Sequence, residues 1–206
     1  MKRAYKINFF GEVSFLILLL SVLTYSQSKT NLQVCNELVD SSLQKVIQKI
    51  PAGSKNIILT LSLGNDYSVF SNNIYAGLQN AGYKISVDDS GIKGELIRLN
   101  YVIDNVSVKY SDLYRDGIWG DYYLKRTVLL SGSYSILGKQ NITDSFIYSA
   151  TDSVRNEEIK LLENSSYEFT RSEKPAEPFL SSLLEPVIAI SAAAAAVILF
   201  FSIRSK

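Results

Sequence analysis

The chain has no histidine and a single cysteine, Cys35. Histidine is the usual general base of enzymes and the commonest zinc ligand, and cysteine nucleophiles normally work beside a histidine. The absence of histidine therefore excludes His-dependent triads, Cys–His nucleophiles and nearly all zinc sites. One cysteine cannot form an intrachain disulfide. We expect Cys35 to be a small buried apolar side chain, with a free thiol or an intermolecular bridge as alternatives.

An excess of charge of one sign is also missing. The chain carries 21 Lys and Arg against 20 Asp and Glu, a formal net charge of +1. Nucleic-acid-binding domains normally carry a basic face, so we predict no nucleic-acid partner. The turn at residues 64–66 has one glycine and an aspartate where a phosphate-binding loop would be glycine-rich. We therefore predict no cofactor.

The N-terminal residues have the layout of a secretory signal peptide. Basic residues precede the apolar run at residues 13–23, and small and polar residues follow it. As a helix this run would extend about 16 Å, roughly half of a bilayer's hydrocarbon core. We predict a signal peptide at residues 1–26, cleaved after Ser26 or Ser28, with an uncleaved anchor as the alternative.

The C-terminal apolar run, residues 187–203, contains no charge. Its length is at the lower limit for a membrane-spanning helix, about 17 residues. A buried helix of a globular domain is the alternative, but such a helix would normally show a polar stripe. Basic residues 204–206 follow directly and favour the cytoplasmic side. We expect a single-pass protein with its N-terminal domain outside the cytoplasm.

The first half of the exported part alternates helix and strand. Apolar residues at three- and four-residue steps predict a helix over residues 31–49, and a β-rich run predicts a strand over 56–63. A second helix over residues 68–80 and a short strand over 83–87 follow, separated by a capping glycine, Gly82.

The second half shows long runs with alternating polarity, at residues 97–110, 124–136 and 142–148. The apolar positions change parity near Asn105, which predicts a β-bulge. We expect an antiparallel meander with an apolar face toward the helices and a hydroxylated face toward water.

The predicted fold class is therefore α+β: two helices on a mostly antiparallel sheet, plus one C-terminal transmembrane helix. The extracytoplasmic domain is placed at residues 27–150. Residues 151–186 are interpreted as a short helix capped by Asp152 and a polar linker that leads to the membrane.

Two Ser-x-x-Lys patterns could in principle supply a serine nucleophile and a lysine base, at Ser42–Lys45 and Ser90–Lys93. The pattern is short and common, and the companion elements of serine acyl enzymes are missing. Spaced acids in residues 112–121 lack the spacing of an EF-hand calcium loop. We predict no catalytic residues and no metal site.

The stretch YSDLYRDGIWGDYYLKR, residues 110–126, gathers Tyr, Trp and Arg between two expected strands. These residue types dominate interaction hot spots. The alternative is that the rings fold back over their own hairpin or contact lipid headgroups. The candidate partner-binding residues are Tyr110, Tyr114, Arg115, Trp119, Tyr122, Tyr123 and Arg126.

The segment IYAGLQNAGYKISVDD, residues 74–89, resembles the small periplasmic α/β domains of flagellar- and curli-assembly proteins. In those domains a helix that ends in a leucine and a glycine-plus-aromatic pair leads into a strand, as Leu78, Gly82 and Tyr83 do here. The later run Leu130 to Tyr134 is similar to their Gly-x-Tyr strand. The resemblance implies a periplasmic fold, whereas this chain has a C-terminal span in place of a lipid-accepting cysteine.

These observations together predict a membrane-anchored binding or assembly module of the cell envelope that is not an enzyme. Its partners would be the lipid bilayer, through the C-terminal helix, and an envelope protein. The inner membrane facing the periplasm is the expected location. The alternatives are a Ser/Lys or carboxylate hydrolase acting on envelope material and a ligand- or lipid-sensing domain.

Overall fold

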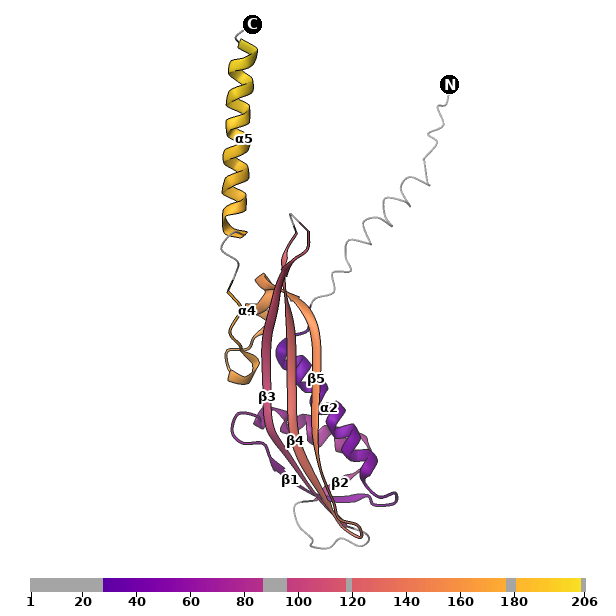
Figure 1. Ribbon diagram of the computed structural model, residues 1–206. Helices are drawn as coiled ribbons and strands as arrows, with labels where there is room; N and C mark the ends of the chain where they lie inside the picture. The colour runs from indigo at the N-terminus through magenta and orange to yellow at the C-terminus, as the bar shows by residue number, and fades with distance from the viewer. Residues whose placement is uncertain (1–27, 87–95, 118–119, 177–180, 205–206) are drawn as a thin grey trace, which may run out of the picture.

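A computed structural model of the chain describes residues 28–86, 96–117, 120–176 and 181–204 (Figure 1). The predicted signal peptide, residues 1–26, lies outside the described residues and stays a prediction. The fold class is confirmed: helices pack on a five-stranded sheet, and one long apolar helix ends the chain.

Helix α2, Asn31–Lys49, begins at the residue that the sequence predicts. Thr30 caps it: the Thr30 hydroxyl accepts from the Gln33 N–H at 3.2 Å, and the Gln33 side chain accepts from the Thr30 N–H at 2.8 Å. This reciprocal capping box satisfies two N–H groups that would otherwise lack partners. The helix ends before Pro51, which cannot continue it.

Helix α3, Ser71–Asn80, is preceded by one turn of 3-10 helix, Ser68–Phe70. Gly82 follows it with a φ of +89°, a left-handed conformation that glycine adopts without a steric penalty. The predicted glycine cap is thereby confirmed, and the chain turns directly into the short strand β2.

The sheet has the order β2-β1-β3-β4-β5. The central strand β3 pairs in parallel with β1, which pairs in parallel with β2, and the meander β3-β4-β5 is antiparallel. Strand bounds are β1 Asn56–Ser62, β2 Lys84–Ser86, β3 Leu96–Arg115, β4 Tyr122–Leu137 and β5 Ile142–Arg155.

The register between β3 and β4 shifts between Ile103 and Asn105, where the sequence predicts a bulge. Gly132 lies opposite this shift, and a Cβ there would approach the Val102 carbonyl oxygen to 2.2 Å and the Phe146 ring to 2.5 Å. The bulge and the glycine therefore let the Phe146 ring cross β4, where it stacks on Tyr101 with ring centroids 5.4 Å apart.

Strand β5 is longer than predicted. The expected helix capped by Asp152 is wrong, because Asp152 lies inside β5 and pairs with Arg126 of β4. The helical residues come later, as a 3-10 turn at Asn156–Glu158 and helix α4 at Ile159–Leu162. The antiparallel ladder with β4 outweighs the capping preference of a single aspartate.

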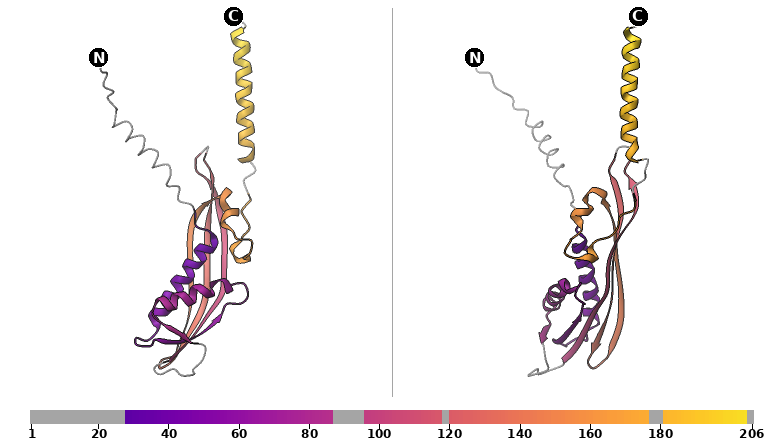
Figure 2. Two further views of the ribbon diagram at one scale, coloured as in Figure 1. Left: turned by 180° about the vertical axis from the view of Figure 1, so that it is seen from behind. Right: turned by 90° about the vertical axis from the view of Figure 1, so that its left-hand side faces the viewer.

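Helices α2, α3 and α4 all lie on one face of the sheet (Figure 2). The opposite face carries the hydroxylated residues of the meander, as predicted; in β4 these are Thr127, Ser131, Ser133 and Ser135. Between helices and sheet lies the apolar core, whose largest fully buried apolar side chains include Leu43, Ile57, Ile74, Leu78, Ile97, Leu99, Leu124, Leu130 and Ile136.

Part of the predicted linker belongs to the domain. The Phe169 ring packs against Tyr67 and Phe70, with centroids 5.4 and 5.5 Å apart, and Thr170 is fully buried. The segment is polar in composition, so its sequence shows little hydrophobic signal. The chain therefore leaves the domain after residue 170 rather than near residue 150.

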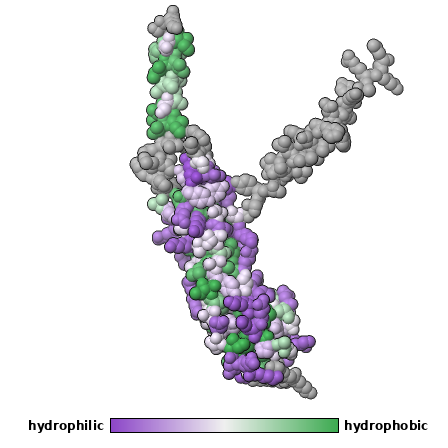
Figure 3. Space-filling model, turned by 45° about the vertical axis from the view of Figure 1, so that its right-hand side comes forward, coloured by the Kyte–Doolittle hydropathy of each residue, from purple (hydrophilic) through white to green (hydrophobic). Residues whose placement is uncertain are grey.

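Helix α5, Ser181–Arg204, is apolar enough to cross a membrane over Pro186–Ile203, by length and composition. None of this window is buried against the domain, and Figure 3 shows α5 as an apolar rod beyond a largely hydrophilic body. A polar stripe is absent from its described side chains, since apolar residues are exposed all round it.

Candidate functional site

The structure divides the predicted partner-binding residues into two groups. Tyr114, Arg115, Tyr122 and Tyr123 lie at the tip of the β3–β4 hairpin, which we call the hairpin tip. Tyr110 and Arg126 are buried in the domain, and Trp119 lies outside the described residues. The structure therefore brings four of the described residues together and places the other two in the interior of the domain.

The side chains of the hairpin tip contact one another. The Tyr114 and Tyr123 rings stack with centroids 5.8 Å apart at an interplanar angle of 21°, and Tyr114 remains 47% exposed. The Arg115 guanidinium lies 5.0 Å from the Tyr122 ring centroid, and its Nε donates to the Gly120 carbonyl at 2.9 Å. The rings thus fold back on their own hairpin and form a preorganised aromatic surface.

Arg155 ties the hairpin tip to the end of β5. Its guanidinium forms ion pairs with Asp121 at 3.2 Å, Glu157 at 2.9 Å and Glu158 at 3.1 Å. One arginine thereby joins the turn of the hairpin to the 3-10 turn before α4. A network of this kind holds a long hairpin in place better than an isolated surface pair would.

The hairpin tip lies where the chain leaves the domain. Lys174 donates to the Asn156 carbonyl at 3.3 Å, and Asn156 directly follows Arg155, the β5 residue that pairs with Tyr123. Figures 1 and 2 show the tip and the start of α5 at the same end of the domain. If α5 spans a membrane, the aromatic tip faces that membrane.

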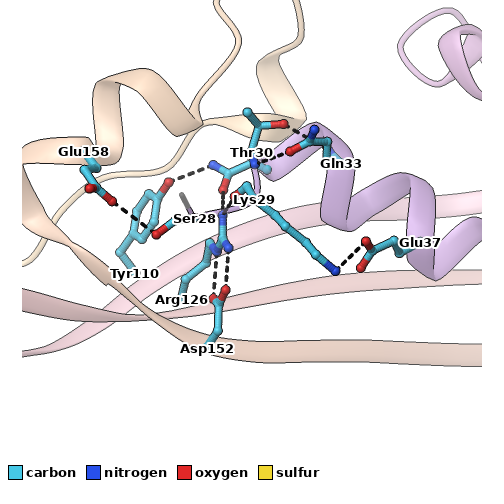
Figure 4. A network of polar contacts seen from close by, with 10 residues as sticks. Ser28, Lys29, Thr30, Gln33, Glu37, Tyr110, Arg126, Asp152 and Glu158 are labelled. Carbon is cyan, nitrogen blue, oxygen red and sulfur yellow. Dashed lines mark hydrogen bonds and ion pairs between the residues drawn. The ribbon is translucent and has the colours of Figure 1, made fainter. Parts of the chain in front are cut away.

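Arg126 is the largest fully buried side chain and is the centre of a polar network (Figure 4). Its Nε donates to Asp152 Oδ1 at 2.8 Å, and Nη2 donates to the other oxygen of the same carboxylate. Its Nη1 donates to the Lys29 carbonyl at 2.7 Å and to Asn31 Oδ1 at 2.8 Å. A buried guanidinium requires such a set of partners, because an unpaired charge in the interior is strongly unfavourable.

Asn31 extends this network to two further segments. Its Nδ2 donates to the Tyr110 hydroxyl and to the Thr170 carbonyl, both at 2.7 Å. Burial raises the pKa of Tyr110, so the phenol stays neutral and accepts the bond. We call Lys29, Asn31, Tyr110, Arg126, Asp152 and Thr170 the Arg126 network. It joins the segment after the predicted signal peptide to the segment before α5.

The sequence does contain the signal that identifies the two interior residues. In β4, Leu124 and Val128 face the helices, and Arg126 lies between them at a position of the same parity. Tyr110 likewise continues the parity of the apolar positions in β3. Side-chain alternation therefore predicts burial for both, against the usual exposure of arginine.

A groove of about 490 Å³ lies between α2 and α3. Polar groups line it, among them Asp40, Gln44, Asn73 and Asn80, and burial followed by the charge of Glu37 raises the pKa of Asp40. Gly77 allows the helices to approach, since a Cβ there would lie 2.5 Å from a Leu43 methyl carbon. The sensing alternative predicts an apolar pocket between helices and sheet, whereas this groove has a mixed polar and apolar lining and lies between two helices.

The Ser42–Lys45 pattern does not bring a base to the serine. The buried Ser42 hydroxyl donates to the Val39 carbonyl at 2.8 Å and also contacts the Tyr101 hydroxyl. The Lys45 amine instead lies 6.0 Å from the Tyr148 ring centroid. Ser90 and Lys93 lie outside the described residues.

Two of the spaced acids in residues 112–121 face cations of the protein. Asp112 lies 3.8 Å from the Lys125 amine, and Asp121 pairs with Arg155. Within the described ranges, no three His, Cys, Asp or Glu side chains are grouped so that they could hold a metal ion.

Cys35 is fully buried in α2, which confirms its predicted role as a small apolar side chain. Burial raises the pKa of its thiol to about 12, and the nearby Arg126 charge offsets only part of this effect. The thiol is therefore protonated and poorly reactive at neutral pH.

No protein family matches the chain, and no curated protein is similar to it in sequence. Weak similarity to solved structures is found. A minor lipoprotein from Acinetobacter baumannii is 15% identical with a TM-score of 0.33, covering 52% of this chain and 70% of that one. The rare lipoprotein B from Shewanella oneidensis is 14% identical with a TM-score of 0.31, covering 71% and 93%.

A third structure, from Helicobacter pylori, is described as a homolog of a neuraminyllactose-binding hemagglutinin. It is 14% identical with a TM-score of 0.31, covering 52% of this chain and 68% of that one. None of these three is described as a flagellar- or curli-assembly protein, so that resemblance stays a prediction. Similarity at this level does not assign a function.

Proposed function

We propose that the chain is a single-pass, non-catalytic module of the cell envelope, anchored by α5 with its α+β domain on the periplasmic side of the inner membrane. The observation that carries the proposal is the exposure of the apolar side chains of α5. Its apolar side chains over Pro186–Ile203 are exposed and pack on nothing in the described chain. Exposed apolar area of this extent is unfavourable in water and favourable in a bilayer.

Membrane fractionation with Ala194→Arg tests the anchor. A charge near the centre of a spanning helix costs about 2.5–3.5 kcal/mol, so we expect the variant to move partly into the soluble fraction. Leu161→Arg is the control, because Leu161 is 75% exposed on the domain surface and lies far along the chain from α5. Extraction of the unaltered chain by alkaline carbonate, or protection of the domain from protease added to spheroplasts, contradicts the proposal.

The hairpin tip is the contact surface that we propose for an envelope protein partner. It supports this role because it combines exposed Tyr and Arg side chains in a fixed arrangement next to the membrane anchor. A photoreactive residue at Tyr114 is expected to crosslink to one discrete protein in intact cells. The same residue at Tyr75, a tyrosine 38% exposed on α3, is the matched control.

The outcomes distinguish three roles for the hairpin tip. A discrete crosslinked protein from position 114 that is absent from position 75 supports the partner-binding role. Crosslinks to lipid alone identify the tip as a headgroup contact and contradict the partner. Equal patterns from both positions show that the tip has no special role.

A further inference from the structure

The two edges of the sheet differ greatly in length. The β2 edge has 3 residues, Lys84–Ser86, whereas the β5 edge has 14 residues, Ile142–Arg155. At about 3.4 Å per residue β5 presents an edge of roughly 45 Å. Among the described elements, only β4 pairs with β5, so its outer side is open.

A hydrogen bond of the β5 backbone indicates which residues direct their N–H and C=O groups outward, away from β4. The Ser145 N–H donates to the neighbouring Asp144 carboxylate at 2.9 Å, a bond that lies outside the β4–β5 ladder. In an antiparallel strand the inward and outward residues alternate, and the β4–β5 register has no shift. The odd-numbered residues therefore direct their N–H and C=O groups outward, and these are Thr143, Ser145, Ile147, Ser149, Thr151 and Ser153.

The β5 edge lacks most of the features that normally prevent a sheet from pairing with another chain. Such edges are usually short, bulged, or marked by proline or lysine. Strand β5 has no proline, no lysine and no bulge, and Ile147 in its middle is 74% exposed. Its two acids, Asp144 and Asp152, have the parity of the helix-facing side, and Asp152 is engaged by Arg126.

A second copy of this chain is a poor occupant for geometric reasons. Figures 1 and 2 show the strands running along the direction of α5, with the chain exit at the Arg155 end. Antiparallel pairing of two β5 strands would put the two exits about 45 Å apart along the strand. The seven-residue step from Lys174 to Ser181 reaches at most about 25 Å. Parallel pairing keeps both exits together, but two-fold symmetry would then set identical outward residues opposite each other, N–H facing N–H, whereas a parallel ladder needs an offset of one residue that breaks this symmetry.

We propose that the β5 edge accepts an extended strand from a different envelope protein, which adds to the sheet through the outward backbone groups of residues 143–153. The partner strand would place an apolar side chain beside Ile147 and a basic or hydroxyl-bearing side chain near Asp144. Main-chain hydrogen bonds supply the affinity in this mode of recognition. The inference uses one part of the proposed function, the membrane anchor α5. It is independent of the role proposed for the hairpin tip.

Amide hydrogen exchange of the full chain tests this inference. Exchange of the outward β5 amides is measured in native membrane vesicles and in the same chain purified to homogeneity in detergent micelles. We expect these amides to exchange more than about tenfold more slowly in the vesicles, because strand pairing satisfies them.

Two variants at Ser149 separate backbone pairing from side-chain docking. Ser149→Pro removes only an outward N–H and leaves the β4–β5 ladder intact, as edge positions permit. Ser149→Ala keeps that N–H and removes the hydroxyl. We expect the proline variant to lose the protection of the remaining outward amides in vesicles and the alanine variant to keep it, with equal thermal stability of both purified variants.

Three results overturn the inference. Equal exchange in vesicles and micelles means that no strand is added. Protection retained in Ser149→Pro means that the contact does not use the backbone. Protection that rises with the concentration of purified protein identifies a second copy as the occupant. Loss of membrane attachment in the vesicle preparation would instead show that the proposed anchor is wrong.

Discussion

The two halves of the domain are held together differently. In the half near the chain exit, the Arg126 network joins five segments of the chain through directional hydrogen bonds. In the distal half, α2 packs on β4 and β5, α3 lies beside α2 and β2, and fully buried aliphatic side chains such as Leu43, Ile74 and Leu78 fill the interior. Apolar packing tolerates small shifts, whereas a buried guanidinium accepts one arrangement only. The polar half therefore fixes where the chain enters and leaves the domain.

The largest effect is expected from Arg126→Met. Removing the guanidinium leaves the amide oxygen of the buried Asn31 and the Lys29 carbonyl without a donor, and the half-exposed Asp152 carboxylate without its ion pair. The free energy of unfolding is expected to fall by about 2–5 kcal/mol, mainly through the unsatisfied acceptors. Chemical denaturation measures the loss. Hydrogen exchange is expected to rise first around Asn31 and Thr170, because the network holds both.

Arg115→Met is the matched control at the hairpin tip. Arg115 lies on the Tyr122 ring at a partly exposed site, so its loss is expected to cost less than about 1 kcal/mol. If the two arginine variants were equally stable, the Arg126 network would not be what secures this half of the domain.

Leu78→Ala tests the distal half. Leu78 is fully buried, and truncation there is expected to cost about 2–5 kcal/mol through lost burial and a cavity. Leu161→Ala, at a 75% exposed position, is expected to change stability by less than about 0.5 kcal/mol. We expect Leu78→Ala to speed hydrogen exchange in α3 and to leave exchange around the Arg126 network unchanged, because the two halves open separately. Equal acceleration in both halves would contradict this.

High pH is expected to destabilise both halves, because each contains one buried group that must stay protonated in the folded state. Burial raises the pKa of Cys35, which lies near Arg126, from 9.0 to about 12, and that of Tyr101, beneath α2, from 10.0 to about 12. The folded state then holds protons that the unfolded state has released. Stability therefore falls as pH rises above about 9, by about 1.4 kcal/mol for each pH unit and group.

Thermal melts at several pH values from about 8 to about 11 measure this loss, because the thiol and the phenol of the unfolded chain ionise in this range. Cys35→Ala is expected to weaken the dependence of the melting temperature on pH at pH values above the pKa of a free thiol. Tyr101→Phe is expected to weaken it at pH values above the pKa of a free phenol. A melt curve of unchanged slope in both variants would show that other groups control alkaline unfolding.

The smallest effect is expected from Tyr114→Ala. The stacked Tyr114–Tyr123 pair is worth about 0.5–1.5 kcal/mol at most, and the exposure of Tyr114 places it at the lower end. Denaturation is expected to show a fold of nearly unchanged stability, while crosslinking from the hairpin tip to the proposed partner weakens. A large loss of stability would mean that the tip is a structural element like the Arg126 network.

The elements that local patterns specify were predicted well. Thr30, Gln33 and the three- and four-residue apolar spacing define α2, and Gly82 defines the end of α3. The parity change near Asn105 identified the bulge in β3. Each of these signals acts within a few residues, where backbone geometry and burial give the same preference.

Two predictions failed where pairing partners decide the structure. Asp152 looks like a helix cap in isolation, but the register with β4 places it opposite Arg126 within β5. Arg126 looks like a surface residue of an aromatic loop, but four hydrogen bonds to three residues of two distant segments make its burial favourable. Neither partner set can be read from the neighbouring sequence, because the partners come from distant parts of the chain.

The sequence by itself determined the class of fold, the apolar C-terminal helix and the exclusion of histidine chemistry, since these depend on composition and on periodicities of two and 3.6 residues. Only the tertiary structure decided which strands pair, that β1 joins β3 in parallel, and that β5 forms a long open edge. It also decided that the hairpin tip, the Arg126 network and the chain exit lie at one end of the domain. Those features depend on contacts between distant segments, whose free energy arises only when the whole sheet has formed.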